Sequence, residues 1–300
     1  MRYAKPALTF EQQADLLLER GMSGDRSTII DRLRSVNYYR LSGYWYTMRI
    51  PASDRAGVRS HQFAPGTTFD DVWRRYVFDR QLRLLVMDAI ERIEVGVRSQ
   101  LAYHHAHQFG PFGYAADSSS LGAEKQAGFV EKVREELGRN SHLFAEHFSM
   151  KYGDQHPMPP IWMAVEIVSF GGVLTLYRGC QPDIRSKVAG SFGVHHRVFD
   201  SWLMALNTVR NICAHHGRLW NRTLGVKPRL PNKNAEWIAK PAISNDKVYC
   251  VLCICAWSLR QIAPQSGWKQ RLAKLLDDAS TIPLRSMGIP EGWEGHPFWS

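Results

Sequence analysis

The sequence predicts an all-α protein. Apolar residues recur every three or four positions in three long stretches, which is the spacing of one buried face of a helix. These stretches cover residues 69–108, 198–216 and 246–262. Extended structure is expected only in one short hairpin near residue 50. We therefore expect a helical bundle with an N-terminal helical extension and a C-terminal helical tail.

The N-terminal extension is predicted to cover residues 1–66. Thr9 and Gln12 match a capping box, in which two residues satisfy each other's backbone N–H groups at the start of a helix. That helix is expected to end at Gly21, because glycine readily adopts the left-handed conformation that follows a helix. A second helix is expected from about residue 27 to residue 41.

Other features of this extension leave its role open. Two consecutive helices permit a DNA-binding helix-turn-helix unit, although the connection of residues 21–26 is longer than the three or four residues usual in that motif. The aromatic residues between 38 and 46 could stack on bases, but packing in the core is favoured. Residues 44–50 and 58–64 are expected to pair as the hairpin.

The central domain is predicted to cover residues 67–265. Its longest helix should begin at Phe69, after the capping residue Thr68, and run to about Gln108, with a break near Asp79 as the alternative. Further helices are expected at residues 123–137, 142–152, 161–177 and 182–189. Residues 266–300 should form a last helix and a tryptophan-rich tail that packs on the body, because exposed rings at a free end are unfavourable.

A stripe of polar residues lies beside the apolar face of the long helix. Its members, about 60° to 100° around the helix from that face, are Glu91, Glu94, Arg98 and His105. This stripe is either a solvated edge, or a set of supporting groups that face the helix of residues 198–216, with Arg98 as an extra phosphate contact. Glu166 lies in an apolar pattern and needs a partner, for which an arginine is expected.

The strongest functional signal lies between residues 206 and 222. Arg210, Asn211, His215 and His216 are polar residues within an otherwise apolar helical pattern. At about 100° per residue, Asn211 and His215 share one face, whereas Arg210 lies roughly 140° from His215. One target can meet both groups only if the arginine wraps around the helix or a second copy of the helix completes the site.

These residue types suit attack on a phosphodiester. Histidine titrates near pH 6.5 and can take or give a proton, while arginine stays charged and grips phosphate oxygens. RNA carries its own nucleophile, the 2′-OH, so cleavage needs no metal and no other cofactor. We expect Arg210 to bind the scissile phosphate, His215 to act as general acid or base, and Asn211 to orient one of them, with His216 as a supporting group.

The spacing Arg-x4-His is weak evidence by itself, but the longer string is more specific. The residues Arg-Asn-Ile-Cys-Ala-His-His at 210–216, followed by Arg-Leu-Trp-Asn-Arg at 218–222, resemble the abortive-infection phage-resistance proteins of the AbiD/AbiF type. These belong to the HEPN superfamily, whose signature is Arg-x(4–6)-His. Residues 37–45, 78–102 and 160–171 are similar as well. The resemblance implies a HEPN-type helical bundle, metal-independent RNA cleavage, and a homodimer that pairs two motifs.

A basic loop follows the motif. Residues 217–240 carry a net charge of +5, which is half of the chain's formal +10, and prolines keep the loop from being helical. Four of its cations are expected to bind the RNA backbone: Arg218, Arg222, Lys227 and Arg229. A solvated loop is the alternative. Trp220 and Trp237 could stack on bases or anchor the loop.

The composition limits the kind of protein. A net charge of +10 and a pI near 9.5 favour a polyanionic partner. The sequence shows neither the roughly 18 consecutive apolar residues of a membrane helix nor a signal peptide. Five cysteines, three of them in the apolar stretch 246–262, make disulfides improbable, so a cytoplasmic location is expected. Cys250 and Cys253 resemble half a zinc site, but no second pair exists and no metal is expected.

Three functions remain to be separated. The favoured one is a metal-independent endoribonuclease of an antiphage abortive-infection or toxin–antitoxin system. The second is a non-catalytic RNA-binding protein held by a structured small RNA. The third is a regulator that binds DNA through its N-terminal helices.

Overall fold

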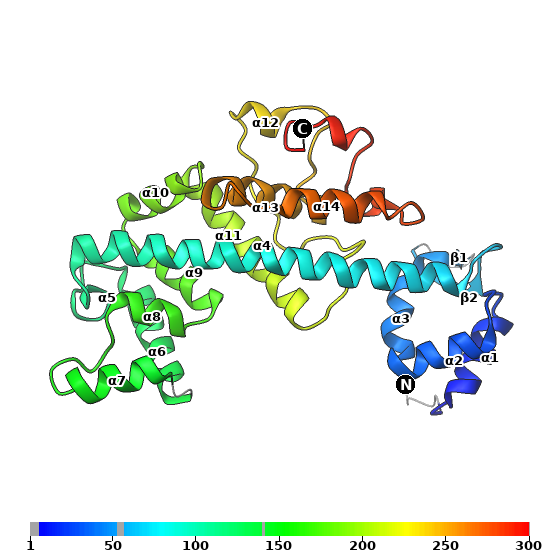
Figure 1. The fold of residues 1–300 in the computed structure, drawn as a ribbon, viewed down its shortest axis with the longest axis horizontal. Coiled ribbons are helices and arrows are strands. Elements are labelled where there is room, and N and C mark those ends of the chain that lie inside the picture. Colours follow the sequence, from blue (N-terminus) through cyan, green and yellow to red (C-terminus); the bar gives the residue numbers. More distant parts are fainter. Residues whose placement is uncertain (1–5, 53–56, 140–141, 300) are drawn as a thin grey trace. The chain divides into compact units, whose positions relative to one another are not determined.

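The computed structural model describes residues 6–52, 57–139 and 142–299. Helices take up 64% of the structure and strands 5%, so the predicted helical-bundle fold with a small hairpin is confirmed (Figure 1). The chain forms two compact units, one of residues 1–82 with 275–283 and one of residues 83–274 with 284–300. The division falls inside a helix, whereas the sequence-based domain boundary lies before it, after residue 66.

The first unit begins with the helices α1 (Phe10–Glu19), α2 (Arg26–Ser35) and α3 (Tyr38–Trp45). The capping box is present, since the Thr9 hydroxyl accepts from the Gln12 N–H and the Gln12 side chain accepts from the Thr9 N–H. The single helix expected over residues 27–41 is wrong. The chain is extended at Val36, and the Asn37 side chain accepts from the Tyr39 N–H at 2.7 Å, so a new helix begins there.

The predicted hairpin is confirmed as β1 (Arg49–Pro51) and β2 (Arg59–Phe63), which pair antiparallel. Arg49 lies opposite Phe63 in an irregular register. The first strand is shorter than expected, because residues 44 and 45 end α3 with both aromatic rings buried, and a 3₁₀ turn (Tyr46–Met48) precedes the strand. Burial of this part of the aromatic cluster favours packing over base stacking.

The longest helix, α4, runs without a break over Phe69–Phe109. The Thr68 hydroxyl accepts from the Asp71 N–H at 3.0 Å, as the sequence predicts for its start. Asp79 is fully buried in this helix, and its carboxylate accepts from the Tyr44 hydroxyl at 2.6 Å. A buried polar group with a partner does not interrupt a helix.

The second unit holds the rest of α4 and a series of shorter helices. They are α5 (Gly113–Ala116), α6 (Ala123–Arg139), α7 (Leu143–Tyr152), α8 (Ile161–Ile167), α9 (Phe170–Gly179), α10 (Pro182–Ser191), α11 (His196–Ala214), α12 (Ala235–Ile238), α13 (Val248–Ile262), α14 (Trp268–Asp277) and the 3₁₀ turns at Leu284–Met287 and Trp293–Gly295. The helix expected over 161–177 is divided into α8 and α9, because the Ser169 side chain caps a new helix by accepting from the Gly172 N–H.

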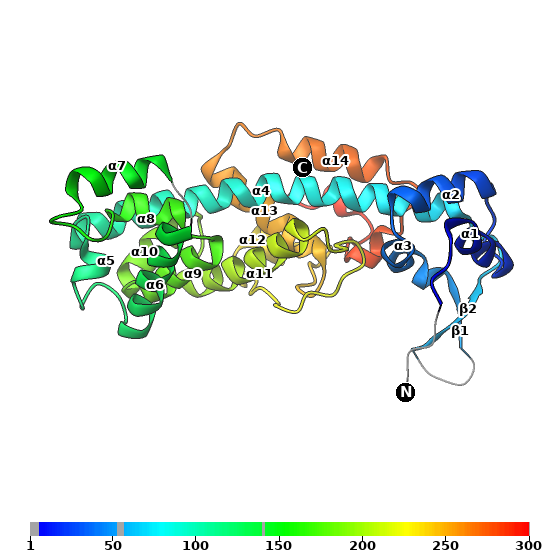
Figure 2. The same cartoon turned by 90° about the horizontal axis from the view of Figure 1, so that it is seen from below.

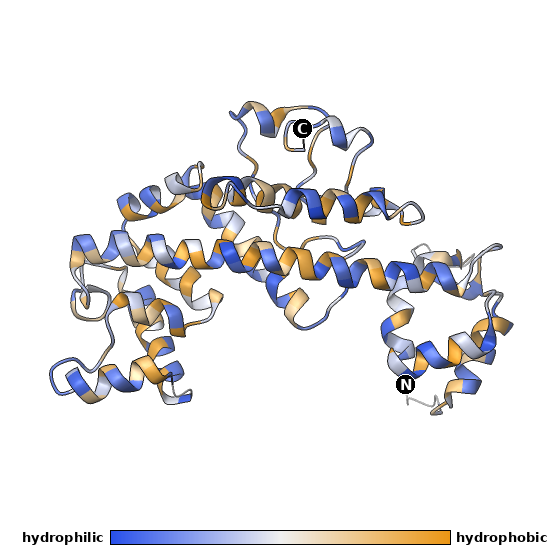
Figure 3. Cartoon of the chain, viewed as in Figure 1, coloured by the Kyte–Doolittle hydropathy of each residue, from blue (hydrophilic) through white to orange (hydrophobic). Residues whose placement is uncertain are grey.

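The core of the second unit forms around α13, which is buried from Val248 to Leu259. Figures 1 and 2 draw α13 beside α4. A Cβ built on Gly96 of α4 would lie 3.2 Å from the Ile262 side chain, so glycine permits this close approach. Figure 3 shows hydrophobic and hydrophilic residues interleaved along the helices, as expected for helices with one buried face. None of the helices within the described ranges has the length and apolar character needed to cross a membrane.

The predicted packing of the C-terminal tail is confirmed. Phe298 is 2% exposed, and its ring centroid lies 4.7 Å from that of Trp237. Trp237 also lies 5.2 Å from Trp202 of α11 and 6.0 Å from Trp257 of α13. Trp237 lies in α12, a short helix that corrects the expectation of no helix in the loop of residues 217–240. It therefore joins the motif helix, the core helix and the tail.

Replacing Trp237 by alanine should lower the free energy of unfolding by roughly 3–5 kcal/mol, because the change leaves a large cavity among three aromatic rings. Chemical denaturation measures the loss. The neighbouring Ile238 is 59% exposed, so Ile238→Ala is the matched control and should change stability by less than about 0.5 kcal/mol. Equal effects of the two substitutions would contradict this role of Trp237.

Candidate functional site

The motif lies at the C-terminal end of α11. This helix is amphipathic, and its buried face consists of Phe199, Trp202, Leu203, Ala205, Leu206, Val209 and Cys213. Its first turn is capped by His195, whose ring Nδ1 accepts from the Arg197 N–H at 3.3 Å. Hydrophobic packing thus fixes the helix in the second unit, and its last turn carries the functional candidates.

The helix ends in a Schellman motif, directly after Ala214. The Gly217 N–H donates to the Ile212 carbonyl at 2.7 Å, and the His216 N–H donates to the Cys213 carbonyl at 3.0 Å. His216 takes the left-handed position, with φ of 56°. The sequence places both histidines within the helical pattern, whereas the structure places His215 at the C-cap and His216 beyond it. Most such motifs have glycine at the position of His216.

This ending exposes most of the motif. Asn211, His215 and His216 are exposed, and Arg210 is half-buried. In the part of the chain that the structure describes, neither the Arg210 nor the His215 side chain forms a hydrogen bond or ion pair with another residue. Both are therefore available to a ligand, and Asn211 lies one turn before His215.

The structure separates the four predicted RNA-binding cations. Arg218 and Arg222 follow the motif directly, and the Arg222 side chain donates to the Arg218 carbonyl at 3.5 Å. Arg229 lies against the other half of α11, because its N–H donates to the Ser201 hydroxyl and its carbonyl accepts from the Trp202 indole, both at 2.8 Å. Ser201 precedes His215 by fourteen residues, which is about 21 Å along a helix.

The remaining loop residues support this division. Lys227 is exposed and lies near Asp246, whose carboxyl pKa is lowered mainly by a hydrogen bond from Ser244 and to a smaller degree by this lysine. Trp220 is fully buried and Trp237 is 3% exposed. Of the two roles considered for these tryptophans, burial favours anchoring of the loop.

Apart from Glu91, the polar stripe on α4 is not a solvated edge. Glu94 is 9% exposed, and the Arg98 side chain binds the Glu94 carboxylate and the Val168 carbonyl, the latter at 2.9 Å. Arg98 also forms the expected pair with Glu166 at 3.5 Å, although Glu166 is exposed rather than buried. Glu91 faces solvent.

Arg98 therefore stabilises the corner between α8 and α9. The cation binds carbonyls at the end of α8, where the helix dipole is negative. This corner approaches α11, since a Cβ on Gly171 would lie 3.9 Å from the Asn207 side chain. Asn207 is one turn before Arg210 and Asn211. The structure shows Arg98 supporting a neighbour of the motif helix, while a direct phosphate contact remains a prediction.

His105 is fully buried beside Phe109, with ring centroids 5.2 Å apart. Neither ring nitrogen has a hydrogen-bond partner among the described residues. Burial lowers the pKa of His105 to about 4, because the charged imidazolium would lose its solvation. His105 is thus a neutral core residue at neutral pH, packed against Phe109.

Metal ligation finds no support in the described ranges. No group of three or more His, Cys, Asp or Glu side chains there is arranged to hold a metal ion. Cys250 and Cys253 are buried and unbridged, and burial raises the pKa of the Cys250 thiol to about 12. Ligation requires the thiolate.

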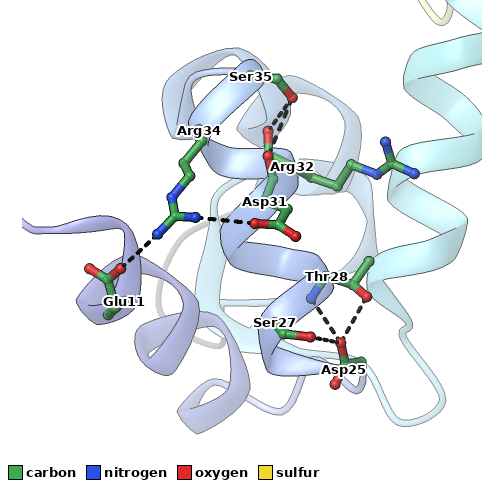
Figure 4. A network of polar contacts seen from close by, with 8 residues as sticks. All are labelled: Glu11, Asp25, Ser27, Thr28, Asp31, Arg32, Arg34 and Ser35. Carbon is green, nitrogen blue, oxygen red and sulfur yellow. Dashed lines mark hydrogen bonds and ion pairs between the residues drawn. The ribbon is translucent and has the colours of Figure 1, made fainter.

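The N-terminal helices use their basic residues within the first unit. Arg34 pairs with Glu11 and Asp31, as Figure 4 shows. The Arg32 guanidinium lies 4.3 Å from the centre of the Trp73 ring. A recognition helix presents such side chains to DNA. Both side chains nevertheless remain exposed, so DNA binding by these helices stays a prediction.

A second group of basic residues, not singled out from the sequence, lies at the start of α11. It consists of Arg185, His195, His196 and Arg197, to which the loop adds Arg229 and Lys233. The run His-His-Arg at residues 195–197 could have indicated this group from the sequence. Cations are unfavourable at the positive end of a helix, so their presence there suggests an anionic ligand.

The left-handed conformation of His216 gives a direct test of the helix ending. His216→Ala and His216→Gly both remove the imidazole, but only alanine keeps the cost of a Cβ at positive φ, about 1–2 kcal/mol. The glycine variant should therefore unfold at higher denaturant than the alanine variant. Equal stabilities would contradict the Schellman geometry.

Burial of His105 predicts acid sensitivity. The unfolded chain binds a proton near pH 6.5 but the folded chain only near pH 4, so stability is lost as pH falls between these values. The loss should approach ~3 kcal/mol. Unfolding curves from pH 7 to 4 should show a shallower decline for His105→Gln than for the wild type or for His107→Gln, which alters an exposed histidine. Identical pH slopes in all three proteins would refute the burial of a neutral imidazole.

Comparison with known proteins identifies the family. A family model described as Abi-like protein matches residues 31–221, which include all of α11, His215 and His216. Neither the curated proteins nor the solved structures contain a match. The match covers well over half of the chain, and the chain belongs to the Abi-like family of abortive-infection proteins.

Proposed function

We propose that this protein is a metal-independent endoribonuclease that acts in abortive infection, with Arg210 and His215 at the catalytic centre. The observation that carries the proposal is the end of α11, where a half-buried guanidinium and an exposed imidazole lie on one short segment without protein partners in the described structure. The likeness of residues 210–222 to the HEPN signature supports the same assignment.

The chemistry follows from the groups available. His215 as general base takes the proton of the ribose 2′-OH, and the 2′-oxygen attacks the adjacent phosphorus. The bond from phosphorus to the 5′-oxygen breaks, and a protonated imidazole gives its proton to that oxygen. Arg210 neutralises the charge that develops on the phosphate oxygens. The products are a 2′,3′-cyclic phosphate and a 5′-OH.

This reaction needs one imidazole as general base, a second as general acid, and an arginine that reaches the same phosphate. On an ideal helix, Arg210 and His215 lie roughly 140° apart. We therefore propose a homodimer in which a second copy of α11 supplies the complementary pair. Asn211, on the His215 face, orients the imidazole or the phosphate.

Backbone strain at His216 also supports a functional end of the helix. Non-glycine residues at positive φ cost free energy and occur often at active sites. His216, directly beside His215, keeps a Cβ at positive φ, where glycine would cost less free energy. The strain is consistent with selection for the position of the imidazoles.

The proposal is tested by incubating single-stranded RNA with the protein in EDTA. Arg210→Ala and His215→Ala should each lower the cleavage rate by about 100-fold or more. His147→Ala and Arg134→Ala are matched controls on exposed helix faces and should cleave at the wild-type rate.

Two outcomes would overturn the assignment. Cleavage that persists in both motif variants would exclude these roles for Arg210 and His215. A wild-type protein that binds RNA tightly but never cleaves it would instead indicate a binding protein held by a small RNA.

A further inference from the structure

Two adjoining hollows lie at the start of α11, far from His215. One has a volume of about 620 Å³ and lies between the first turns of α10 and α11. The other, of about 640 Å³, lies between the start of α11 and the basic loop. Both are lined by Arg197 and Arg229, so they meet at these two side chains, and we call the two hollows together the basic groove.

The charge of this groove is strongly positive. Its lining includes the cations Arg185, Arg197, Arg229 and Lys233. Asp200 is the acidic residue in the lining, and its carboxylate is bound in bidentate fashion by Arg178 at 2.7 and 3.0 Å. Asp200 is therefore neutralised by a residue outside the groove, and none of the four cations forms an ion pair among the described residues.

Arg185 gives a second, independent indication of an anionic ligand. Its Nε is removed from solvent and has no hydrogen-bond partner among the described residues. Part of the Arg185 charge is thus desolvated without a protein acceptor, which favours an anion bound at the remaining N–H groups of this guanidinium. The amino end of α11 adds a positive dipole, which makes a cluster of cations there unfavourable unless an anion binds.

The groove is also preorganised. The backbone of Arg229 is held by Ser201 and Trp202, and the Asn245 side chain donates to the Pro228 carbonyl at 3.0 Å. The pKa of His196 is lowered by partial burial and by its neighbours His195, Arg185 and Arg197. His196 therefore stays neutral at neutral pH and offers a hydrogen bond rather than a charge.

We propose that this groove binds backbone phosphates of single-stranded RNA, upstream or downstream of the bond cleaved at Arg210 and His215. This inference rests on the proposed function. The groove lies about 21 Å along α11 from His215, a distance that about six stacked nucleotides span at ~3.4 Å each. It positions the strand and takes no part in bond cleavage, so stacked strands shorter than about six nucleotides cannot occupy both sites.

The test measures binding of fluorescently labelled oligoadenylates, whose bases stack, with lengths of 4 and 12 nucleotides, to His215→Ala protein, in which cleavage is suppressed. Adding Arg185→Gln and Arg197→Gln should weaken binding of the 12-mer about tenfold at 0.15 M salt and leave the 4-mer less affected. The slope of log affinity against log salt should fall by about 1.4, or 0.7 for each lost cation.

Arg134→Gln with Arg139→Gln removes two positive charges from the exposed side of α6 and is the matched control. Should the Arg185 variant unfold, Arg229→Gln with Lys233→Gln replaces it, because both of these side chains are exposed. Equal affinities of the groove and control variants for the 12-mer would overturn the proposal, as would displacement of the 12-mer by micromolar inorganic phosphate.

The binding test is distinct from the test of the proposed function. Loss of 12-mer binding in the groove variants, together with no RNA cleavage by the wild type, would remove the nuclease assignment and retain the RNA groove. Normal cleavage by the wild type, together with unchanged 12-mer binding in the groove variants, would retain the nuclease assignment and remove the RNA groove.

Discussion

The end of α11 is the constraint on which the account of this protein depends. Two backbone hydrogen bonds, from Gly217 to Ile212 and from His216 to Cys213, stop the helix one residue before His215. One more helical turn would place the histidines among the side chains of the helix surface. With the Schellman ending, His215 lies at an open end, and the strain at His216 shows that the chain keeps a Cβ where glycine would be more stable.

Packing of the basic loop then determines where its cationic side chains lie along α11. Trp220 and Trp237 are buried, and the main chain at Arg229 is bound to Ser201 and Trp202 of α11. The loop therefore delivers cations to both ends of the same helix rather than to one continuous patch. A strand that follows α11 would meet a catalytic pair at one end and a binding groove at the other.

The sequence was sufficient for most of the fold, because helical periodicity and caps are local properties. Thr9 and Thr68 begin their helices as their side chains predict. It was insufficient at Asn37 and Ser169, where a single side-chain cap divides a continuous apolar pattern. In the candidate site, too, local features could be predicted from the sequence and long-range packing could not. Exposure of His215 follows from local backbone geometry, whereas the groove of Arg185, Arg197 and Arg229 exists only because distant segments pack together.

The use of the ribose 2′-OH is the central claim, and one measurement tests it most directly. A 12-nucleotide RNA and the same sequence with 2′-deoxyribose throughout are incubated with the protein in EDTA, and the new ends are identified by mass spectrometry. The account predicts cleavage of the RNA alone, with 2′,3′-cyclic phosphate ends. Cleavage of the deoxy strand, or activity that disappears in EDTA, would contradict it.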